Sequence, residues 1–188
     1  MNRRGWLQSM LAVGLGSTFG RGWAAQAMPK DMKGIEALQK SWKTLLAEGF
    51  KAPTPTDTFK VSNAEWKKRL SPLAYDVLRE EGTERPGSSP LNQEKREGVF
   101  VCAGCDLPVF TSAMKYESGT GWPSFFTTIP GVFETKQDFL LIYPRTEYHC
   151  TRCGGHHGHI FDDGPKPTGL RYCNNGVALK FIPKRAKA

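Results

Sequence analysis

The five cysteines of the chain divide into two close pairs and one single residue. The pairs are CxxC motifs, CAGC at 102–105 and CTRC at 150–153. A CxxC motif on a tight turn places two thiolates on one side, and two such motifs form a tetrahedral sulfur site for zinc. Four ligands close the coordination shell, so we expect one structural zinc ion per chain. Its ligands are Cys102, Cys105, Cys150 and Cys153.

Two disulfides are the alternative arrangement, because the chain also has the features of an exported protein. A disulfide inside a CxxC motif is strained and more typical of redox motifs than of structural bridges. Zinc is therefore favoured. If the protein is exported after it has folded, zinc can bind before the thiols meet an oxidising compartment.

Cys173 is the cysteine left over from this site. A lone cysteine is either an inert core residue or a reactive thiol. Arg171 precedes it by two residues, so in a strand both side chains point to the same face. We expect Arg171 to lower the pKa of the Cys173 thiol, and the Asn175 amide to hydrogen-bond near it. This setting favours a nucleophile, because the thiolate is the reacting form.

Three of the four histidines lie in the segment GHHGH at 155–159. His156 and His159 are three residues apart, and we expect them to approach one another in a turn around Gly158, with His157 pointing elsewhere. A surface loop and further metal ligands are alternatives, but four cysteines already satisfy a zinc ion. We favour an acid–base pair that works near neutral pH. His149 is expected to be structural.

A tryptophan stands in the segment SGTGWPSF at 118–125. Pro123 disfavours helical geometry at the preceding residue, so Trp122 lies on a stiff turn between glycines. Such a side chain usually belongs to a core. It can instead form an apolar wall for a small methylated group.

The elements that must position these residues are mainly short strands. An apolar fraction of 39%, with 20 Gly and 13 Pro, favours β structure with long loops. From Gly98 onwards, short apolar or alternating runs separated by turn residues predict antiparallel strands. These strands are expected at 99–102, 109–111, 139–143, 147–150, 159–161, 170–173 and 177–181.

Helices are expected before residue 98. Apolar residues recur at helical spacing over 31–50 and predict an amphipathic helix that packs on the rest of the chain, rather than one that binds a partner. Residues 51–57 form a linker. Ser62 or Asn63 can cap a helix over 64–70, and Ser71-Pro72 opens a second one that ends near Glu81-Gly82.

Residues 1–27 are expected to be a cleavable signal peptide. Arg3-Arg4 has twin-arginine character, an apolar run covers 10–19, and Ala25-Gln26-Ala27 offers small residues for cleavage. Asn2 replaces the usual Ser or Thr, so a general secretory route stays open. The apolar run is shorter than the roughly 20 residues that a bilayer span needs. We therefore expect a periplasmic protein without stable membrane insertion after signal removal.

The charge of the chain does not indicate a nucleic-acid partner. The formal net charge of +8 falls to +5 when the three arginines of residues 1–27 are removed. The remaining surplus is dispersed, as on an ordinary solvated surface. No glycine-rich phosphate loop is visible in the sequence, so no nucleotide is expected.

Several motifs together resemble one family. GWPSF at 121–125, HHGHIFDDGP at 156–165 and TGLRYCNN at 168–175 are similar to the hallmark motifs of B-type methionine sulfoxide reductases. The TERP segment at 83–86 and both CxxC motifs fall in the family's order, and the likeness covers about 61–183. The chain then divides into the signal peptide (1–27), the amphipathic helix with its linker (28–60) and the catalytic domain (61–185).

The resemblance implies two small antiparallel sheets in a barrel-like sandwich, with the four-cysteine zinc site at one end and short N-terminal helices. It implies thiol-dependent reduction of the R epimer of methionine sulfoxide, mainly in peptides, and so the repair of oxidised proteins outside the cytoplasm. The site residues that it implies are the nucleophile Cys173, the sulfoxide-facing His156 and His159, Trp122 on the substrate methyl, Asn175 completing the pocket, and Arg171 and Asp163 tuning the site.

The sequence departs from many family members at Thr120, where they carry a resolving cysteine. The other four cysteines are assigned to zinc. We therefore expect a Cys173 sulfenic acid to be reduced directly by an external thiol, from a thioredoxin-like protein. Two other classes stay open: a zinc-ribbon binding module with an inert, buried Cys173, and a secreted domain held by disulfides.

Overall fold

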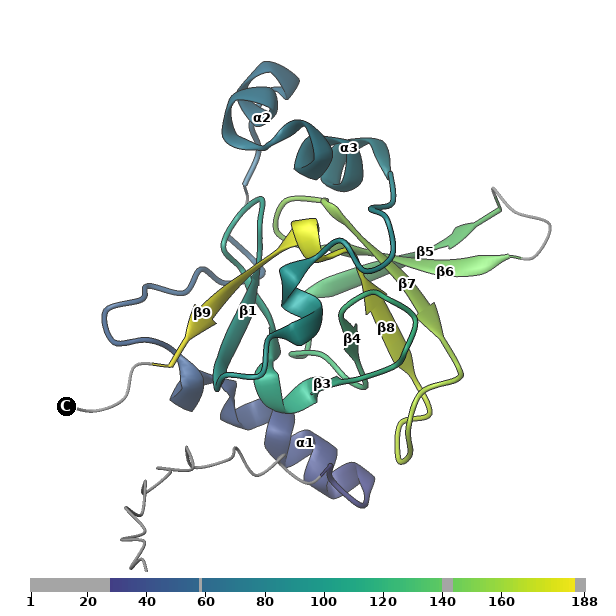
Figure 1. Ribbon diagram of the computed structural model, residues 1–188. Helices are drawn as coiled ribbons and strands as arrows, with labels where there is room; N and C mark the ends of the chain where they lie inside the picture. The colour runs from purple at the N-terminus through teal and green to yellow at the C-terminus, as the bar shows by residue number, and fades with distance from the viewer. Residues whose placement is uncertain (1–27, 58, 140–143, 185–188) are drawn as a thin grey trace, which may run out of the picture.

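The computed structural model describes residues 28–57, 59–139 and 144–184, so the predicted signal peptide lies outside the described residues. The described residues fold into two antiparallel sheets, one with the strand order β2-β1-β9 and one with the order β3-β4-β8-β7-β6-β5 (Figure 1). The strands are β1 (Gly98–Cys102), β2 (Pro108–Thr111), β3 (Lys115–Tyr116), β4 (Ser124–Phe125), β5 (Phe133–Asp138), β6 (Arg145–Cys150), β7 (His156–Phe161), β8 (Arg171–Asn174) and β9 (Leu179–Pro183).

The predicted fold class is confirmed: the chain is mainly β, with two antiparallel sheets and a few short helices. Over the described residues, however, the strands do not close into a barrel. Six of the seven predicted strands coincide with or overlap observed ones. The prediction for 139–143 was wrong at Phe139, which lies outside any strand, and residues 140–143 are outside the described part.

The amphipathic segment after residue 30 forms two helices rather than one. Asp31 caps α1 (Met32–Lys40) by accepting a hydrogen bond from the Gly34 amide at 2.8 Å, and a 3₁₀ helix, η1 (Ser41–Leu45), follows directly. Ile35 and Leu45 are buried, and Leu45 packs against Val99 and Val101 of β1. The expected packing on the rest of the chain is therefore confirmed.

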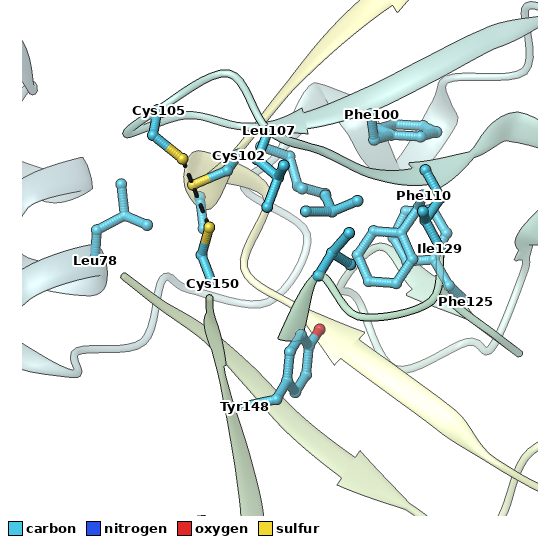
Figure 2. Close-up of a cluster of buried hydrophobic side chains, with 14 of the residues drawn as sticks. Leu78, Phe100, Cys102, Cys105, Leu107, Phe110, Phe125, Ile129, Tyr148 and Cys150 are labelled. Carbon is cyan, nitrogen blue, oxygen red and sulfur yellow. Dashed lines mark hydrogen bonds between the residues drawn. The ribbon is translucent and has the colours of Figure 1, made fainter. Parts of the chain in front are cut away.

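The two predicted helices before the sheets are present. Ser62 caps α2 (Asn63–Arg69) and Ser71 caps α3 (Pro72–Glu80), each through its side-chain oxygen. Leu78 of α3 is buried beside the cysteine cluster (Figure 2). The remaining helices are single 3₁₀ turns: η2 (Pro90–Gln93), η3 (Ser112–Met114) and η4 (Gly176–Ala178).

The core is aromatic and lies between the two sheets (Figure 2). Phe110 of β2 and Phe125 of β4 stack with ring centroids 3.9 Å apart, and Phe100 meets Phe125 edge to face at 5.1 Å. Tyr148 and Tyr172 add the aromatic rings of β6 and β8. Contacts of this kind join residues from both sheets into one hydrophobic cluster.

The face of the six-stranded sheet that points away from the aromatic core is polar. Residues directly opposite each other in antiparallel strands share a face, and alternate residues point to opposite faces. Following the register across five strands gives one polar row on the face away from the aromatic core: Lys136, Glu147, His159, Cys173 and Ser124. Sheet pairing alone thus brings the lone cysteine and one histidine together.

None of the helices in the described ranges has the length and apolar character needed to cross a membrane.

Candidate active site

The four paired cysteines come together in one cluster, in contact with the hydrophobic core. Cys102 and Cys105 flank the turn after β1, and Cys150 and Cys153 flank the turn after β6. The sulfur atoms of Cys102 and Cys153 lie 3.7 Å apart, and those of Cys105 and Cys150 lie 3.6 Å apart (Figure 2 labels three of the four residues). All four sulfur atoms lie within 4.8 Å of one another.

These distances fit a tetrahedral metal site. A zinc–sulfur bond of about 2.3 Å gives sulfur–sulfur edges of about 3.8 Å in a tetrahedron, whereas a disulfide requires about 2.05 Å. All five cysteines lie in the described part of the chain, and none is joined in a disulfide. The predicted ligand set can therefore hold one metal ion, and the disulfide alternative does not match the geometry.

A cavity of about 180 Å³ opens on the polar face of the six-stranded sheet. Four of the residues predicted for the site line it. Five others complete its wall. The predicted residues are Trp122, His159, Cys173 and Asn175, and the others are Thr83, Arg145, Gly158, Phe161 and Asn174.

Cys173 on β8 is half-buried at this cavity, with His159 of β7 directly opposite in the register. Burial raises the pKa of the Cys173 thiol above its usual range. The charge of Arg171 and hydrogen bonds from Thr120 and Arg171 act in the opposite direction, while Asp163 adds to the rise. Arg171 thus has the predicted influence on Cys173, but desolvation outweighs it and the net direction is upward.

His159 is held by a buried carboxylate. Its Nε2 lies 2.8 Å from Oδ2 of Asp138, and the same oxygen accepts from Arg145 Nη2 at 2.5 Å. Burial lowers the pKa of His159, while the hydrogen bond to Asp138 opposes that shift. The sequence reasoning missed both Asp138 and Arg145. They stand at the ends of β5 and β6, on either side of residues 139–144.

His156 and His159 share a face because β7 contains a bulge. His149 pairs with His156, but Tyr148 pairs with Gly158, so His157 is an extra residue in the strand. The two rings lie 5.6 Å apart, as predicted, although they approach within a strand and not in a turn. Gly158 has a φ of 153°, and a Cβ there would lie 2.0 Å from the Cys173 carbonyl oxygen.

His157 points into the core, where its Nδ1 lies 3.1 Å from the Asn174 side-chain oxygen. His156 stays on the polar face but is only 1% exposed and does not line the cavity. Burial lowers the pKa of His156 to about 3, so its imidazole is neutral at pH 7. Of the two histidines predicted to face the substrate, His159 alone reaches the cavity.

Trp122 and Asn175 are both fixed by the loop that follows α3. The Trp122 indole donates to the Glu84 carbonyl at 3.1 Å, and the Glu84 amide donates to the Asn175 side chain at 3.0 Å. The buried Glu84 carboxylate accepts from the Val177 amide of η4 at 3.0 Å. Asn175 also donates to the His157 carbonyl, at 3.1 Å. Glu84 therefore connects two walls of the cavity.

Arg171 and Asp163 form a bidentate ion pair beside the cavity, with distances of 2.7 and 2.8 Å. The guanidinium lies over the Phe161 ring at 4.2 Å. Neither residue of the pair lines the cavity. Arg171 therefore acts on Cys173 through its charge and its hydrogen bond, and Asp163 through its charge, while the Phe161 ring packs on the guanidinium.

Known proteins resemble this chain over most of its described length. A SelR domain model matches residues 70–183, more than half of the chain. The chain belongs to the B-type methionine sulfoxide reductase family. It is 47% identical over 123 residues to "Peptide methionine sulfoxide reductase MsrB" of Agrobacterium fabrum, covering 65% of this chain and 91% of that protein.

Two further relatives carry the same name. The protein of Methanosarcina barkeri is 51% identical over 121 residues, which cover 64% of this chain and 85% of the relative. That of Bradyrhizobium diazoefficiens is 47% identical over 137 residues, 71% of this chain and 97% of the relative. Membership of the B-type reductase family confirms the resemblance seen in the motifs. It also removes the binding-module alternative, which required an inert Cys173.

Proposed function

We propose that the chain reduces peptide-bound methionine-R-sulfoxide to methionine, with Cys173 as nucleophile and a Cys173 sulfenic acid as intermediate. As a member of this family the chain is an oxidoreductase, a peptide-methionine (R)-S-oxide reductase. The main support for this reaction route is that Cys173 and His159 form a cross-strand pair and line the same cavity as Trp122.

The cavity suits a methyl sulfoxide. Trp122 offers an apolar ring surface for the S-methyl group, and its indole nitrogen is already occupied by the Glu84 carbonyl. Arg145 and His159 supply the polar lining toward which the sulfoxide oxygen turns. Discrimination between epimers by such a pocket is worth about 1–3 kcal/mol for each misplaced small group.

The proton balance follows from the two pKa directions. Burial raises the pKa of Cys173 and lowers that of His159, so at neutral pH the thiol keeps its proton and the imidazole is neutral. His159 accepts it as sulfur attacks and delivers it to the sulfoxide oxygen. The attack joins the Cys173 sulfur to the substrate sulfur, and the sulfur–oxygen bond of the substrate breaks as hydroxide leaves. Hydroxide then adds to the Cys173 sulfur, the sulfur–sulfur bond breaks, methionine leaves, and Cys173 remains as a sulfenic acid. Asp138 stabilises the transient imidazolium.

The oxidised cysteine needs two electrons from outside the chain. Thr120 hydrogen-bonds to Cys173, and the other four cysteines form the metal cluster. An external thiol therefore attacks the sulfenic acid, water leaves, and a mixed disulfide forms. A second thiol releases Cys173. We assign this role to a thioredoxin-like protein.

The metal of the cysteine cluster is assigned as one structural zinc ion. Its four ligands tie the turn after β1 to the turn after β6, and so join the two sheets. The ion supplies folding free energy and no step of the reaction.

We also propose that the protein works in the periplasm, on oxidised proteins there. This rests on the twin-arginine character of residues 1–27. Cell fractionation of a tagged chain tests it: the wild type is expected in the periplasmic fraction, and replacement of Arg3 and Arg4 by lysine is expected to retain it in the cytoplasm. An unchanged distribution would contradict twin-arginine export.

The test of the function is reduction of the separated R and S epimers of a methionine sulfoxide peptide with dithiothreitol as reductant. We expect turnover of the R epimer alone, and its loss in Cys173→Ser. Cys153→Ser serves as the contrast, since it should act through stability and zinc content. Turnover of both epimers, or activity retained in Cys173→Ser, would contradict the proposal.

A further inference from the structure

A second group of potential metal ligands lies on the polar face of the six-stranded sheet, apart from the four cysteines. Glu147 and His149 stand two residues apart on β6, and the β6–β7 register places His156 opposite His149. The ligand atoms of these three residues lie within 4.8 Å of one another. The bulge at His157 creates this arrangement, because it brings His156 onto the same face.

The atoms in the group converge without completing hydrogen bonds. Nε2 of His149 lies 3.0 Å from Oε1 of Glu147, and Nδ1 of His156 contacts the same oxygen. Nevertheless Glu147 Oε1, His149 Nε2 and both His156 nitrogens are buried and find no hydrogen-bond partner of acceptable geometry among the described residues. Buried polar atoms are rarely left in this state.

His156 is enclosed by the protein, and its side chain is only 1% exposed. Neither of its ring nitrogens finds a hydrogen-bond partner among the described residues, although Nδ1 contacts the Glu147 carboxylate. An imidazole nitrogen with a free lone pair is the form that binds a metal ion.

From this we infer a second metal site, formed by Glu147, His149 and His156, that takes a divalent transition-metal ion such as Zn²⁺. Two imidazole nitrogens and one carboxylate oxygen make a ligand set that zinc accepts, with bonds of about 2.0–2.2 Å. Those bonds imply ligand separations of about 3.3–3.6 Å in a tetrahedron, so the 3.0 Å between His149 and Glu147 and the closer contact between His156 and Glu147 must widen when an ion binds.

The residues around the site give it a net negative charge and leave it accessible to an ion from solvent. Lys136 lies 3.3 Å from the second oxygen of Glu147 and also contacts Glu81, so the two carboxylates outnumber the one lysine. His149 is 16% exposed, whereas Lys136 and Glu81 are 49% and 40% exposed. An ion enters past His149 and competes with Lys136 for Glu147.

Occupancy of this site couples to the active site through the two adjacent histidines. The His156 and His159 rings lie 5.6 Å apart, and Glu147 is the register partner of His159. A bound dication fixes His156 and disfavours the imidazolium that His159 must form. We therefore expect bound metal to slow sulfoxide reduction. This consequence, unlike the site itself, rests on the proposed function.

Zn²⁺ titration of the folded, zinc-loaded protein tests the site, after a mild chelator has removed weakly held metal. The wild type and Cys173→Ser are expected to bind one further equivalent with the same Kd. His149→Ala is expected to weaken this binding by more than about hundredfold, since loss of an outer-shell partner alone costs 10–100-fold. Lys136→Met, which removes the competing cation, is expected to tighten it.

Two controls separate binding from folding and charge. His149→Ala should retain the wild-type Tm and the first zinc equivalent, and Glu134→Gln removes an exposed carboxylate opposite His149 without removing a ligand. A wild type that binds one equivalent in total, or a His149→Ala variant that binds the second as tightly, would overturn the site. Binding of the second ion with unchanged turnover of the R epimer would overturn the coupling and leave the proposed reaction intact.

Discussion

His159 and Cys173 stand directly opposite each other in the β7–β8 ladder, on the one face of the sheet that is turned away from the aromatic core. Opposed side chains in an antiparallel pair have Cβ atoms about 4.5–5.5 Å apart. The proposed acid–base residue and the proposed nucleophile are thus placed by backbone pairing, and the Asp138 contact then fixes the imidazole.

Arg171→Met should make the Cys173 thiol harder to ionise. Arg171 lowers the pKa of Cys173 through its charge and a hydrogen bond, so its removal leaves the upward shift caused by burial unopposed. The pH midpoint of iodoacetamide alkylation is expected to move to higher pH, with slower alkylation at pH 7. Lys180→Met, a change at an exposed lysine on β9, serves as the charge control. An unchanged midpoint would contradict the electrostatic role of Arg171.

Asp138→Asn should impair the acid–base step. The variant keeps an acceptor for His159 but removes the carboxylate charge that stabilises the imidazolium, so kcat/KM is expected to fall about 10- to 100-fold. Because Asp138 raises the pKa of His159, the acid limb of the pH–rate profile should move to lower pH. Glu134→Gln, an exposed carboxylate on the same strand, should change neither quantity. Wild-type kinetics in Asp138→Asn would exclude the proposed support of His159.

Thr120→Cys should change the fate of the oxidised enzyme. The Thr120 side chain lies near enough to the Cys173 sulfur to lower the pKa of the thiol, so a thiol in its place can attack the sulfenic acid within the chain. We expect an intramolecular disulfide after one turnover, detected by peptide mapping, and loss of sulfenic acid trapping by dimedone. Thr120→Ser is the matched control and should behave as the wild type. Persistent dimedone labelling in Thr120→Cys would show that the two side chains do not meet.

Cys105→Ser should destabilise the whole fold. The variant leaves three sulfur ligands for the proposed zinc ion, which would tie together turns from both sheets. Loss of a structural metal belongs to the few changes that cost more than about 4 kcal/mol. Thermal unfolding and zinc analysis should show a lower Tm and loss of the first equivalent, whereas Cys173→Ser should retain both. A wild-type Tm in Cys105→Ser would mean that the metal contributes little to folding.

The residue types of the candidate site could be predicted from the sequence more fully than their positions in space. Local signals located the helix caps at Ser62 and Ser71, both CxxC turns and most strands, because each depends on a few adjacent residues. Strand β5 was missed because four consecutive side chains from Glu134 to Gln137 are exposed, so no apolar alternation marks it. Asp138 ends that strand and was missed with it.

The placement of the histidines depended on strand register, which local patterns do not contain. The spacing of His156 and His159 predicted that they approach one another. In the structure a bulge places them on one face, and this bulge depends on the pairing of β7 with β6. The burial of His156 away from the cavity, and the net rise in the pKa of Cys173, both follow from long-range packing. Charge neighbours such as Arg171 can be read from the sequence, but the desolvation that outweighs them cannot.

The most direct test of the account is a single turnover without any reductant. Pre-reduced, zinc-loaded protein is mixed with an excess of methionine-R-sulfoxide peptide, and methionine, free thiols and dimedone adducts are counted. We predict one methionine per chain, loss of one thiol, and the adduct on Cys173, with the zinc content unchanged. Absence of methionine until a reductant is added, or loss of two thiols with a disulfide to a zinc ligand, would contradict the sulfenic acid route.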